Sequence, residues 1–191
     1  VLYAIVMLSI IGGWLPKYFV DKLGMNPYSG RMRAMLIFAF FPLLALLAQP
    51  LGHTSYWFPV IIIGIAGAAH QAWSANLFST IGDMFPKSAI ATVTGIGGMA
   101  GGIGAFIINK GSGALFDFAS GSTMVDGQAS VMTKELLASG AQYLTGPMKF
   151  FGFEGIRAGY FIIFCICAVA YLIGWIVMKI LVPKYKPIVT E

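Results

Sequence analysis

Long apolar runs, separated by short polar stretches, organise this chain. A helix needs ~20 predominantly apolar residues to cross the ~30 Å hydrocarbon core of a bilayer. Five runs of roughly this kind can be distinguished, and they cover residues 1–16, 34–51, 57–81, 89–108 and 160–182. The pattern therefore predicts an all-α integral membrane protein with about five transmembrane helices.

The first run is short for a membrane span and begins without methionine. It also lacks the basic segment and the small-residue cleavage site of a secretory signal peptide. We therefore interpret it as the truncated end of a longer helix, and residues 1–191 as a fragment of a larger membrane protein.

The composition agrees with a membrane setting. Hydrophobic residues make up 58% of the chain and charged residues 10%, and the mean hydropathy is +0.83. Soluble domains usually carry about 25% charged residues, so this chain has too few charges to cover a surface in water. The net charge of +5 does not indicate a nucleic acid partner, because the basic residues fall between the apolar runs, as in membrane proteins. Membrane lipid is the expected surrounding.

The distribution of Lys and Arg predicts the orientation. Eight of the twelve basic residues fall on one side of the predicted spans, namely Lys17, Lys22, Arg31, Arg33, Lys87, Lys179, Lys184 and Lys186. Short loops rich in Lys and Arg stay in the cytoplasm. We therefore expect the chain to begin on the outer side of the membrane and to end with its C-terminus in the cytoplasm.

One large polar insertion, residues 111–155, separates the last two predicted helices on the outer side. It contains Ser, Gly, Thr and Asp, and residues 131–143 form an amphipathic stretch that predicts a short surface helix. Long external loops of transporters can act as lids. A tolerated insertion is the simpler interpretation, and we favour it here.

A cluster of polar side chains lies within the third apolar run. Unpaired polar groups are costly in hydrocarbon, so such side chains normally face a cavity or a partner helix. At 100° per residue, one face carries His70, Trp73 and Ser74, and a neighbouring face carries Gln71 and Ser74. A solute-binding site is one interpretation. Hydrogen bonds that join neighbouring helices are the other.

The fourth run is rich in glycine at helical spacings. Gly97 and Gly101 are four residues apart, as are Gly98 and Gly102. Small residues at this spacing let helix backbones approach closely, and glycine also weakens a helix and lets it bend. A static packing groove and a moving, gating helix both remain open.

Asp83 follows the third run, at the predicted inner end of that helix. It can pair with Lys87, four residues on, or with Arg31 or Arg33 across the inner face. An exposed pair contributes only ~0–1 kcal/mol, so a surface contact is one interpretation and a conformational latch is the other.

The sequence contains no pattern that predicts an enzyme active site or a metal site. His70 has no second histidine or cysteine at ligand spacing, so no metal site is predicted. No membrane span carries the Asp and His that would activate a serine nucleophile. We therefore expect neither an enzyme nor a bound cofactor.

Two segments resemble a known family. One spans Gly64 to Gly104 and contains Ala-Ala-His-Gln-Ala-Trp-Ser-Ala-Asn-Leu-Phe, Asp-Met-Phe-Pro-Lys and Gly-Ile-Gly-Gly-Met-Ala-Gly; the other is Gly12-Gly13-Trp14-Leu15, followed by Arg31-Met32-Arg33. These motifs resemble bacterial hexuronate transporters, in the anion:cation symporter branch of the major facilitator superfamily. The chain departs from the family where Pro16, Lys17 and Tyr18 stand in place of Ser-Asp-Arg. The resemblance implies helices eight to twelve of a twelve-helix protein, in its C-terminal six-helix bundle, with the N-terminal half missing.

The resemblance also implies a function. It indicates proton-coupled uptake of a sugar acid, such as glucuronate or galacturonate, across the bacterial inner membrane. Sugar hydroxyls need partners that donate and accept hydrogen bonds, and an indole covers a sugar ring well. We therefore expect Gln71, Ser74 and Asn76 to bind the substrate, with Trp73 packed on it and His70 either a ligand or a packing residue. A non-transporting membrane subunit or assembly protein is the alternative.

Overall fold

The computed structural model describes residues 1–186. These residues form two compact units, of which the first contains residues 1–99 together with the chain from Cys165 onward, and the second contains Ala100–Phe164. Five helical segments are long and apolar enough to cross a membrane, namely Leu2–Leu23, Pro27–Gly52, Trp57–Met84, Lys87–Ser120 and Ile156–Leu181. The predicted set of about five spanning helices is therefore confirmed.

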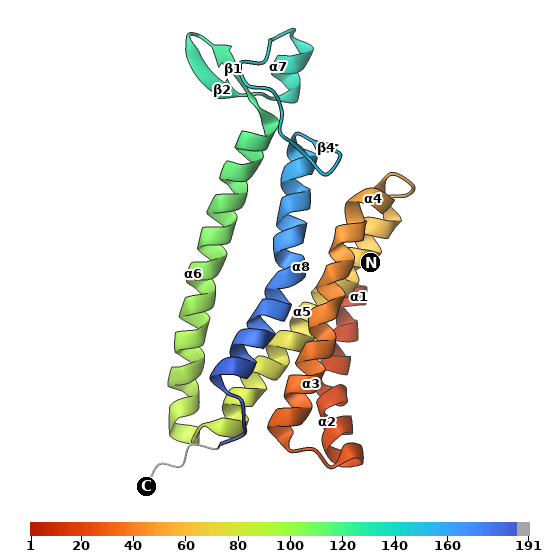
Figure 1. The fold of residues 1–191 in the computed structure, drawn as a ribbon, viewed down its shortest axis with the longest axis vertical. Coiled ribbons are helices and arrows are strands. Elements are labelled where there is room, and N and C mark those ends of the chain that lie inside the picture. The colour runs from red at the N-terminus through yellow and green to blue at the C-terminus, as the bar shows by residue number, and fades with distance from the viewer. Residues whose placement is uncertain (187–191) are drawn as a thin grey trace. The chain divides into compact units, whose positions relative to one another are not determined.

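The first two segments are built from several helical pieces. The first consists of α1 (Leu2–Val6), the 3-10 turn η1 (Met7–Ile10) and α2 (Ile11–Leu23); the second consists of α3 (Pro27–Phe40), the 3-10 turn η2 (Phe41–Leu47) and α4 (Ala48–Gly52). The other three are the single helices α5 (Trp57–Met84), α6 (Lys87–Ser120) and α8 (Ile156–Leu181). Figure 1 labels these elements along the ribbon.

The first two helices extend beyond the apolar runs. The first continues through Pro16 to Leu23, and the second begins at Pro27 rather than at residue 34. Gly24, with φ of 63°, ends α2, and the Asn26 side chain accepts a hydrogen bond from the Ser29 backbone N–H at the start of α3. These capping interactions end helices in their polar terminal turns, whereas hydropathy marks only the part that lies in hydrocarbon.

Helix α6 is also longer than its apolar run and ends at Ser120, so the polar loop begins at Gly121 and not at residue 111. The Ser112 and Ser120 hydroxyls donate to the backbone carbonyls of Ile108 and Phe116, at 2.7 and 2.8 Å. Serines that satisfy themselves in this way do not end a helix. Gly121 ends the helix instead. Its φ is 79°, and a Cβ there would lie 2.5 Å from the Thr145 carbonyl oxygen.

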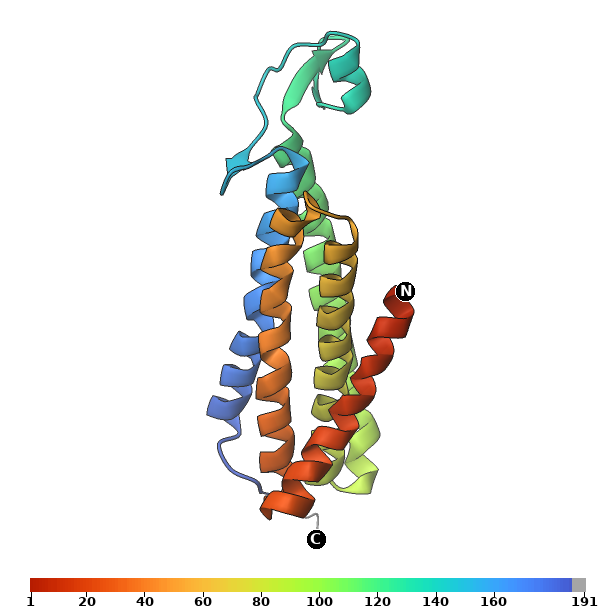
Figure 2. The same cartoon turned by 90° about the vertical axis from the view of Figure 1, so that its right-hand side faces the viewer.

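Small residues let α2 pack closely on α5 in the first unit. A Cβ added to Gly12 would lie 2.6 Å from the Cα and Cβ atoms of Ala72. Ala34 and Phe38 of α3 join Ala69 and Ala72 of α5 in one buried cluster. In Figure 2 the N-terminal helix runs obliquely past α3 and α5. Close backbone approach is the expected means of association in lipid, where apolar side chains gain little from leaving their surroundings.

The C-terminal part of α8 belongs to the first unit and is held in it by side-chain hydrogen bonds. The Trp175 indole N–H donates to the Met32 carbonyl at 2.8 Å, and the Tyr28 hydroxyl donates to the Val182 carbonyl. The Tyr185 hydroxyl donates to the Asp83 carbonyl at 3.3 Å. These contacts attach the end of α8 and the residues after it to α3 and α5.

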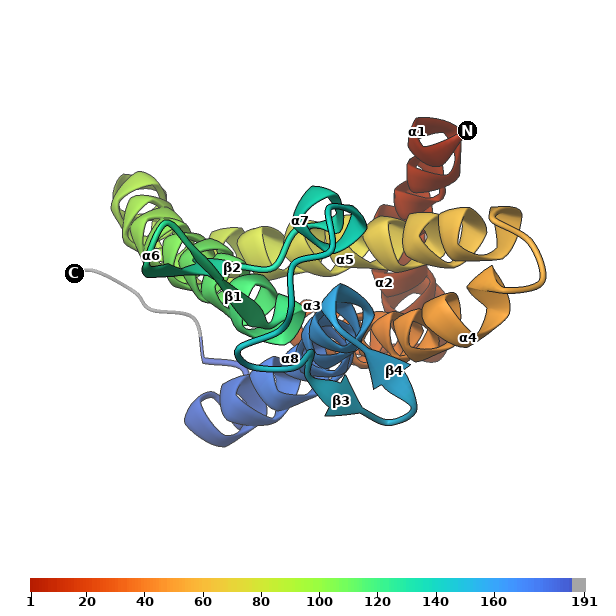
Figure 3. The same ribbon diagram turned by 90° about the horizontal axis from the view of Figure 1, so that it is seen from above.

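The second unit carries two small antiparallel hairpins between the end of α6 and the start of α8, seen from above in Figure 3. Strand β1 (Ser122–Val125) pairs with β2 (Gln128–Val131), and β3 (Lys149–Phe150) pairs with β4 (Phe153–Glu154). The surface helix predicted over 131–143 is wrong at both ends, because α7 covers only Lys134–Ala138. Val131 belongs to β2 instead, and the Thr133 side chain caps α7 by accepting from the Leu136 N–H.

Candidate functional site

Helix α5 presents three different faces. One is buried, and its most enclosed members are Gly64, Ala68, Ala69, Ala72, Asn76 and Thr80. A second face contacts α8 through His70 and Trp73. The third face carries Gln71, Ala75 and Phe78, which are exposed. The predicted site residues are therefore divided among three environments.

His70 and Trp73 meet Tyr171 of α8. The Tyr171 hydroxyl is hydrogen-bonded to Nδ1 of His70. The ring centroids of Tyr171 and Trp73 lie 5.5 Å apart in an edge-to-face arrangement. Tyr171 was not among the residues predicted from sequence, although a tyrosine within an apolar span is a signal because its hydroxyl needs a partner.

The indole of Trp73 has an unused donor. Its Nε1 atom is buried and has no hydrogen-bond partner among the residues that the structure describes. Gly174 of α8 leaves room beside the ring, since a Cβ there would lie 3.8 Å from the indole. A buried donor without an acceptor costs ~1–3 kcal/mol, so an acceptor that reached Nε1 would bind favourably.

Asn76 replaces a hydrogen bond that helix α2 lacks because of Pro16. Pro16 has no N–H, so it cannot donate to the carbonyl of Gly12 four residues earlier in the helix. The Nδ2 atom of Asn76 donates to that carbonyl at 2.8 Å and to the Ala72 carbonyl at 2.8 Å. The side-chain amide of Asn76 therefore links α2 to α5. Asn76 is buried there, with 1% of its surface exposed.

The carboxamide oxygen of Asn76 is not accessible to a solute in this structure. Oδ1 is buried and has no hydrogen-bond partner within the described part of the chain. A substrate role for Asn76 stays a prediction, and it could act only through this oxygen because both bonds of Nδ2 go to backbone carbonyls.

Gln71 and Ser74 are the two predicted ligands without protein partners. Gln71 is exposed and Ser74 is half-buried, and neither side chain is hydrogen-bonded to any residue from 1 to 186. Gln71 lies at the middle of the 28-residue helix α5, about 20 Å from either end. An exposed carboxamide in the middle of a candidate span needs a hydrogen-bonding partner, so we expect one from outside the described chain, either a neighbouring helix or the contents of a polar cavity.

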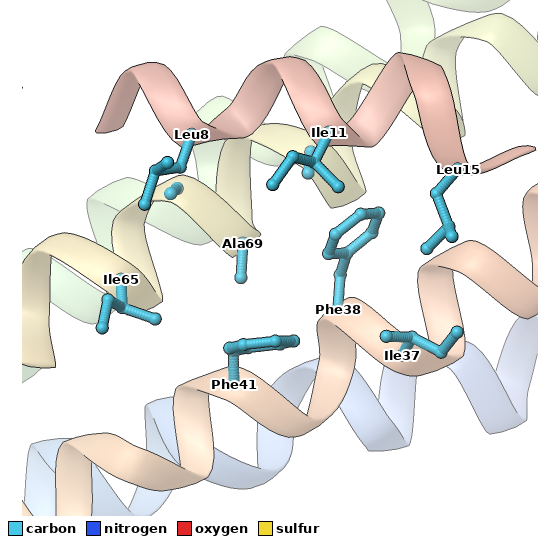
Figure 4. A pocket seen from close by; sticks show the side chains of 10 residues that line it. Leu8, Ile11, Leu15, Ile37, Phe38, Phe41, Ile65 and Ala69 are labelled. Atoms are coloured by element: carbon cyan, nitrogen blue, oxygen red, sulfur yellow. The ribbon is translucent and has the colours of Figure 1, made fainter. Parts of the chain in front are cut away.

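The apolar cavity in Figure 4 is a different feature. It has a volume of about 180 Å³ between the first helical segment, the second segment (α3 and η2) and α5, and is lined by Leu8, Ile11, Leu15, Ile37, Phe38, Phe41, Ile65, Ala68, Ala69 and Ala72. A polar solute would find no side-chain hydrogen-bonding group in it. This cavity therefore does not fit a sugar acid, and the α8-facing and exposed faces of α5 fit one better.

At the end of α5, Asp83 pairs with Arg31 of α3. Nε of Arg31 lies 2.5 Å from Oδ2 of Asp83, and the second guanidinium nitrogen lies 3.3 Å from Oδ1. The two side chains are 24% and 25% exposed. Arg33 is exposed and Lys87 is exposed. Of the three cations predicted as partners, the structure selects Arg31.

Reversing the Arg31–Asp83 pair should reveal its strength. Arg31→Asp and Asp83→Arg should each lower the free energy of unfolding by about 1–2 kcal/mol, because a two-point charged hydrogen bond is lost in a partly screened setting. The double reversal should recover part of this loss. Thermal melting of the purified protein measures the effect, with Arg33→Ala as a control near wild type. Additive losses in the double variant would mean that the pair contributes nothing.

The four predicted packing or gating glycines lie on α6. Gly97, Gly98, Gly101 and Gly102 are all exposed. Their small size therefore leaves a shallow, open helix surface, and their part in gating stays a prediction.

Comparison with known proteins gives one distant similarity. The chain is 30% identical over 111 residues to the Hexuronate transporter of Escherichia coli strain K12 and to that of Escherichia coli O157:H7. Each alignment covers 56% of this chain and 24% of the transporter, so the chain spans about a quarter of the length of these relatives. No family model matches the chain, and no solved structure matches it.

These findings describe a multi-pass membrane protein with distant similarity to a transporter. The similarity is to a protein that moves solutes rather than to an enzyme, and five candidate spans accompany it. Within residues 1–186 no group of three or more His, Cys, Asp or Glu could hold a metal ion.

Proposed function

We propose that the chain is part of a secondary active transporter of the major facilitator type that takes up a sugar acid with protons. The observation that carries the proposal is Gln71, an exposed carboxamide at mid-membrane depth without a partner among the described residues. The similarity to hexuronate transporters supports the choice of substrate class.

The proposed binding surface consists of His70, Gln71, Trp73 and Ser74 on α5, with Tyr171 on α8. Gln71 and Ser74 offer both donors and acceptors to sugar hydroxyls. The indole of Trp73 supplies an apolar face, and its N–H is buried without an acceptor among the described residues. The Tyr171 hydroxyl bound to His70 holds the imidazole in one orientation, so one ring nitrogen remains to face a solute.

The charged part of the substrate needs groups from elsewhere in the protein. The apolar runs 1–16, 34–51, 57–81, 89–108 and 160–182 contain no Asp, Glu or Arg, and Lys179, near the end of the last run, is their one basic residue. A carboxylate in hydrocarbon requires a counter-charge, and coupling to protons requires a titratable group. We therefore place the cation and the proton-carrying acid in a part of the transporter that this chain does not contain.

Uptake by the complete protein in proteoliposomes tests the proposal. Radiolabelled glucuronate or galacturonate should accumulate when the outside is made acidic, and a protonophore should abolish the accumulation. Glucose, which lacks the carboxylate, is the matched control and should not enter. Absence of sugar acid uptake under a proton gradient would remove the proposed function and leave the non-transporting subunit as the interpretation.

The orientation is part of the same proposal. With the basic loops inside, an impermeant thiol reagent added to intact cells should label a cysteine at Asp126, in the β1–β2 hairpin, but not one at Ser29, at the start of α3. The reverse labelling would contradict it.

A further inference from the structure

The two hairpins of the second unit have the same turn. Asp126 and Gly127 connect β1 to β2 with φ of 50° and 79°, and Phe151 and Gly152 connect β3 to β4 with φ of 49° and 80°. Two-residue turns with positive φ at both positions suit antiparallel hairpins, and they favour Asn-Gly or Asp-Gly. The first hairpin follows this preference, whereas the second places phenylalanine where Asn or Asp is expected.

Phenylalanine at this position is unfavourable, and within residues 1–186 its ring is covered only in part, by Phe150 and Phe161. A bulky residue held at positive φ is strained, because its side chain crowds the backbone. Burial of the ring in the protein would offset the cost, but Phe151 is 81% exposed. A strained and exposed aromatic ring at a hairpin tip indicates a contact with something outside the described chain.

The position of the hairpin identifies that contact. Gly155 alone separates β4 from α8, a candidate membrane span. The rings of Phe150, Phe151 and Phe153 lie 6.2, 5.9 and 4.9 Å from the ring of Phe161. Phe161 is in the second turn of α8, so the hairpin lies beside the first turns of that helix (Figure 1).

This depth corresponds to the boundary between headgroups and hydrocarbon. The 26 residues of α8 measure about 39 Å, which exceeds the ~30 Å hydrocarbon core and leaves the terminal turns among the headgroups. Aromatic rings concentrate at this level of the bilayer. The other end of the hairpin is polar, since Lys149 and Glu154 pair across the strands at 3.7 Å with side chains 75% and 55% exposed.

We propose that the β3–β4 hairpin is an interfacial anchor and that the exposed ring of Phe151 inserts into the lipid at the headgroup boundary. The lipid surface is the partner because the aromatic cluster is continuous with the membrane-spanning surface of α8. Transfer of the exposed ring from water into lipid is favourable and offsets the strain of the turn. The inference does not depend on the transported solute.

Fluorophores at the two matched turn positions test the anchor. In the complete protein, with Cys165 and Cys167 replaced by alanine, Phe151→Cys and Asp126→Cys are each labelled with an environment-sensitive dye and reconstituted in phosphatidylcholine vesicles. Because the two positions share one backbone conformation, the label strains both turns alike. At position 151 the emission should shift to the blue, and spin-labelled lipids with the nitroxide near the headgroup should quench it. Iodide should quench it several-fold less than at position 126.

Two results would overturn the anchor. Equal quenching by iodide at both positions would place Phe151 in water. A blue-shifted emission that spin-labelled lipid does not quench would place the ring against protein, either another part of the transporter or a second copy. Phe151→Asn, which gives the turn its preferred sequence, provides a folded reference in which circular dichroism should be unchanged.

Discussion

Replacing Asn76 with leucine should lower the free energy of unfolding by about 1–3 kcal/mol, the cost of a buried backbone acceptor left without a donor. Pro16 cannot serve the Gly12 carbonyl within α2, and the Asn76 amide does so at 2.8 Å. Leucine has a similar size but no donor, so the Gly12 carbonyl would lose its partner in the membrane. Melting of the detergent-solubilised protein measures the loss.

A double-mutant cycle shows whether Pro16 is the cause. Pro16→Ala restores an N–H that can donate to the Gly12 carbonyl inside the helix, so Asn76→Leu should cost much less in that background. The coupling between the two sites should be about 1 kcal/mol or more. Thr80→Val is a matched control, because its hydroxyl bonds a carbonyl of its own helix, that of Asn76, and its cost should not depend on Pro16. Strictly additive effects of Asn76→Leu and Pro16→Ala would contradict this account.

Replacing Gln71 with alanine should reduce sugar acid uptake about two- to tenfold, which corresponds to the loss of one hydrogen bond of about 0.5–1.5 kcal/mol. Stability should hardly change, because Gln71 is exposed and makes no hydrogen bond within residues 1–186. The combination of lost uptake and retained melting temperature separates a substrate contact from a structural one.

The same helix face provides the control for Gln71. Phe78 is exposed two turns further along α5, and Phe78→Leu keeps that face apolar, so uptake should remain near wild type. Initial rates of labelled glucuronate uptake by the complete protein measure both variants. Normal uptake by Gln71→Ala would remove Gln71 from the binding surface, and a loss of uptake accompanied by unfolding would make its role structural.

Much of the fold could be predicted from the chain because hydropathy is a local property. Each apolar run had to form a helix, since backbone groups in hydrocarbon must be satisfied within their own segment. The ends of the helices could not be predicted from hydropathy. Helix α6 continues to Ser120 because serine hydroxyls bond back to the preceding turn, and hydropathy scores such residues only as polar.

The candidate site shows the corresponding limit. The position of the polar cluster on α5 follows from the sequence, but the partner of each side chain does not. Asn76 and Gln71 are five residues apart and equally polar, yet one is buried against α2 and the other is exposed. Periodicity defines which residues share a face, and it does not say which helix covers that face.

The sequence by itself therefore determined the class of membrane protein, the number of candidate spanning helices and the polar cluster within the third of them. Only the tertiary structure decided that Asn76 donates to the carbonyl of Gly12, 64 residues earlier in the chain, which Pro16 leaves without a donor. It also decided that Tyr171 is hydrogen-bonded to His70, 101 residues earlier. It also decided that Arg31, and not Arg33 or Lys87, pairs with Asp83. The physical reason is that burial cost and helix propensity act residue by residue, whereas a hydrogen bond between helices depends on their crossing and rotation, which the whole set of packed side chains fixes.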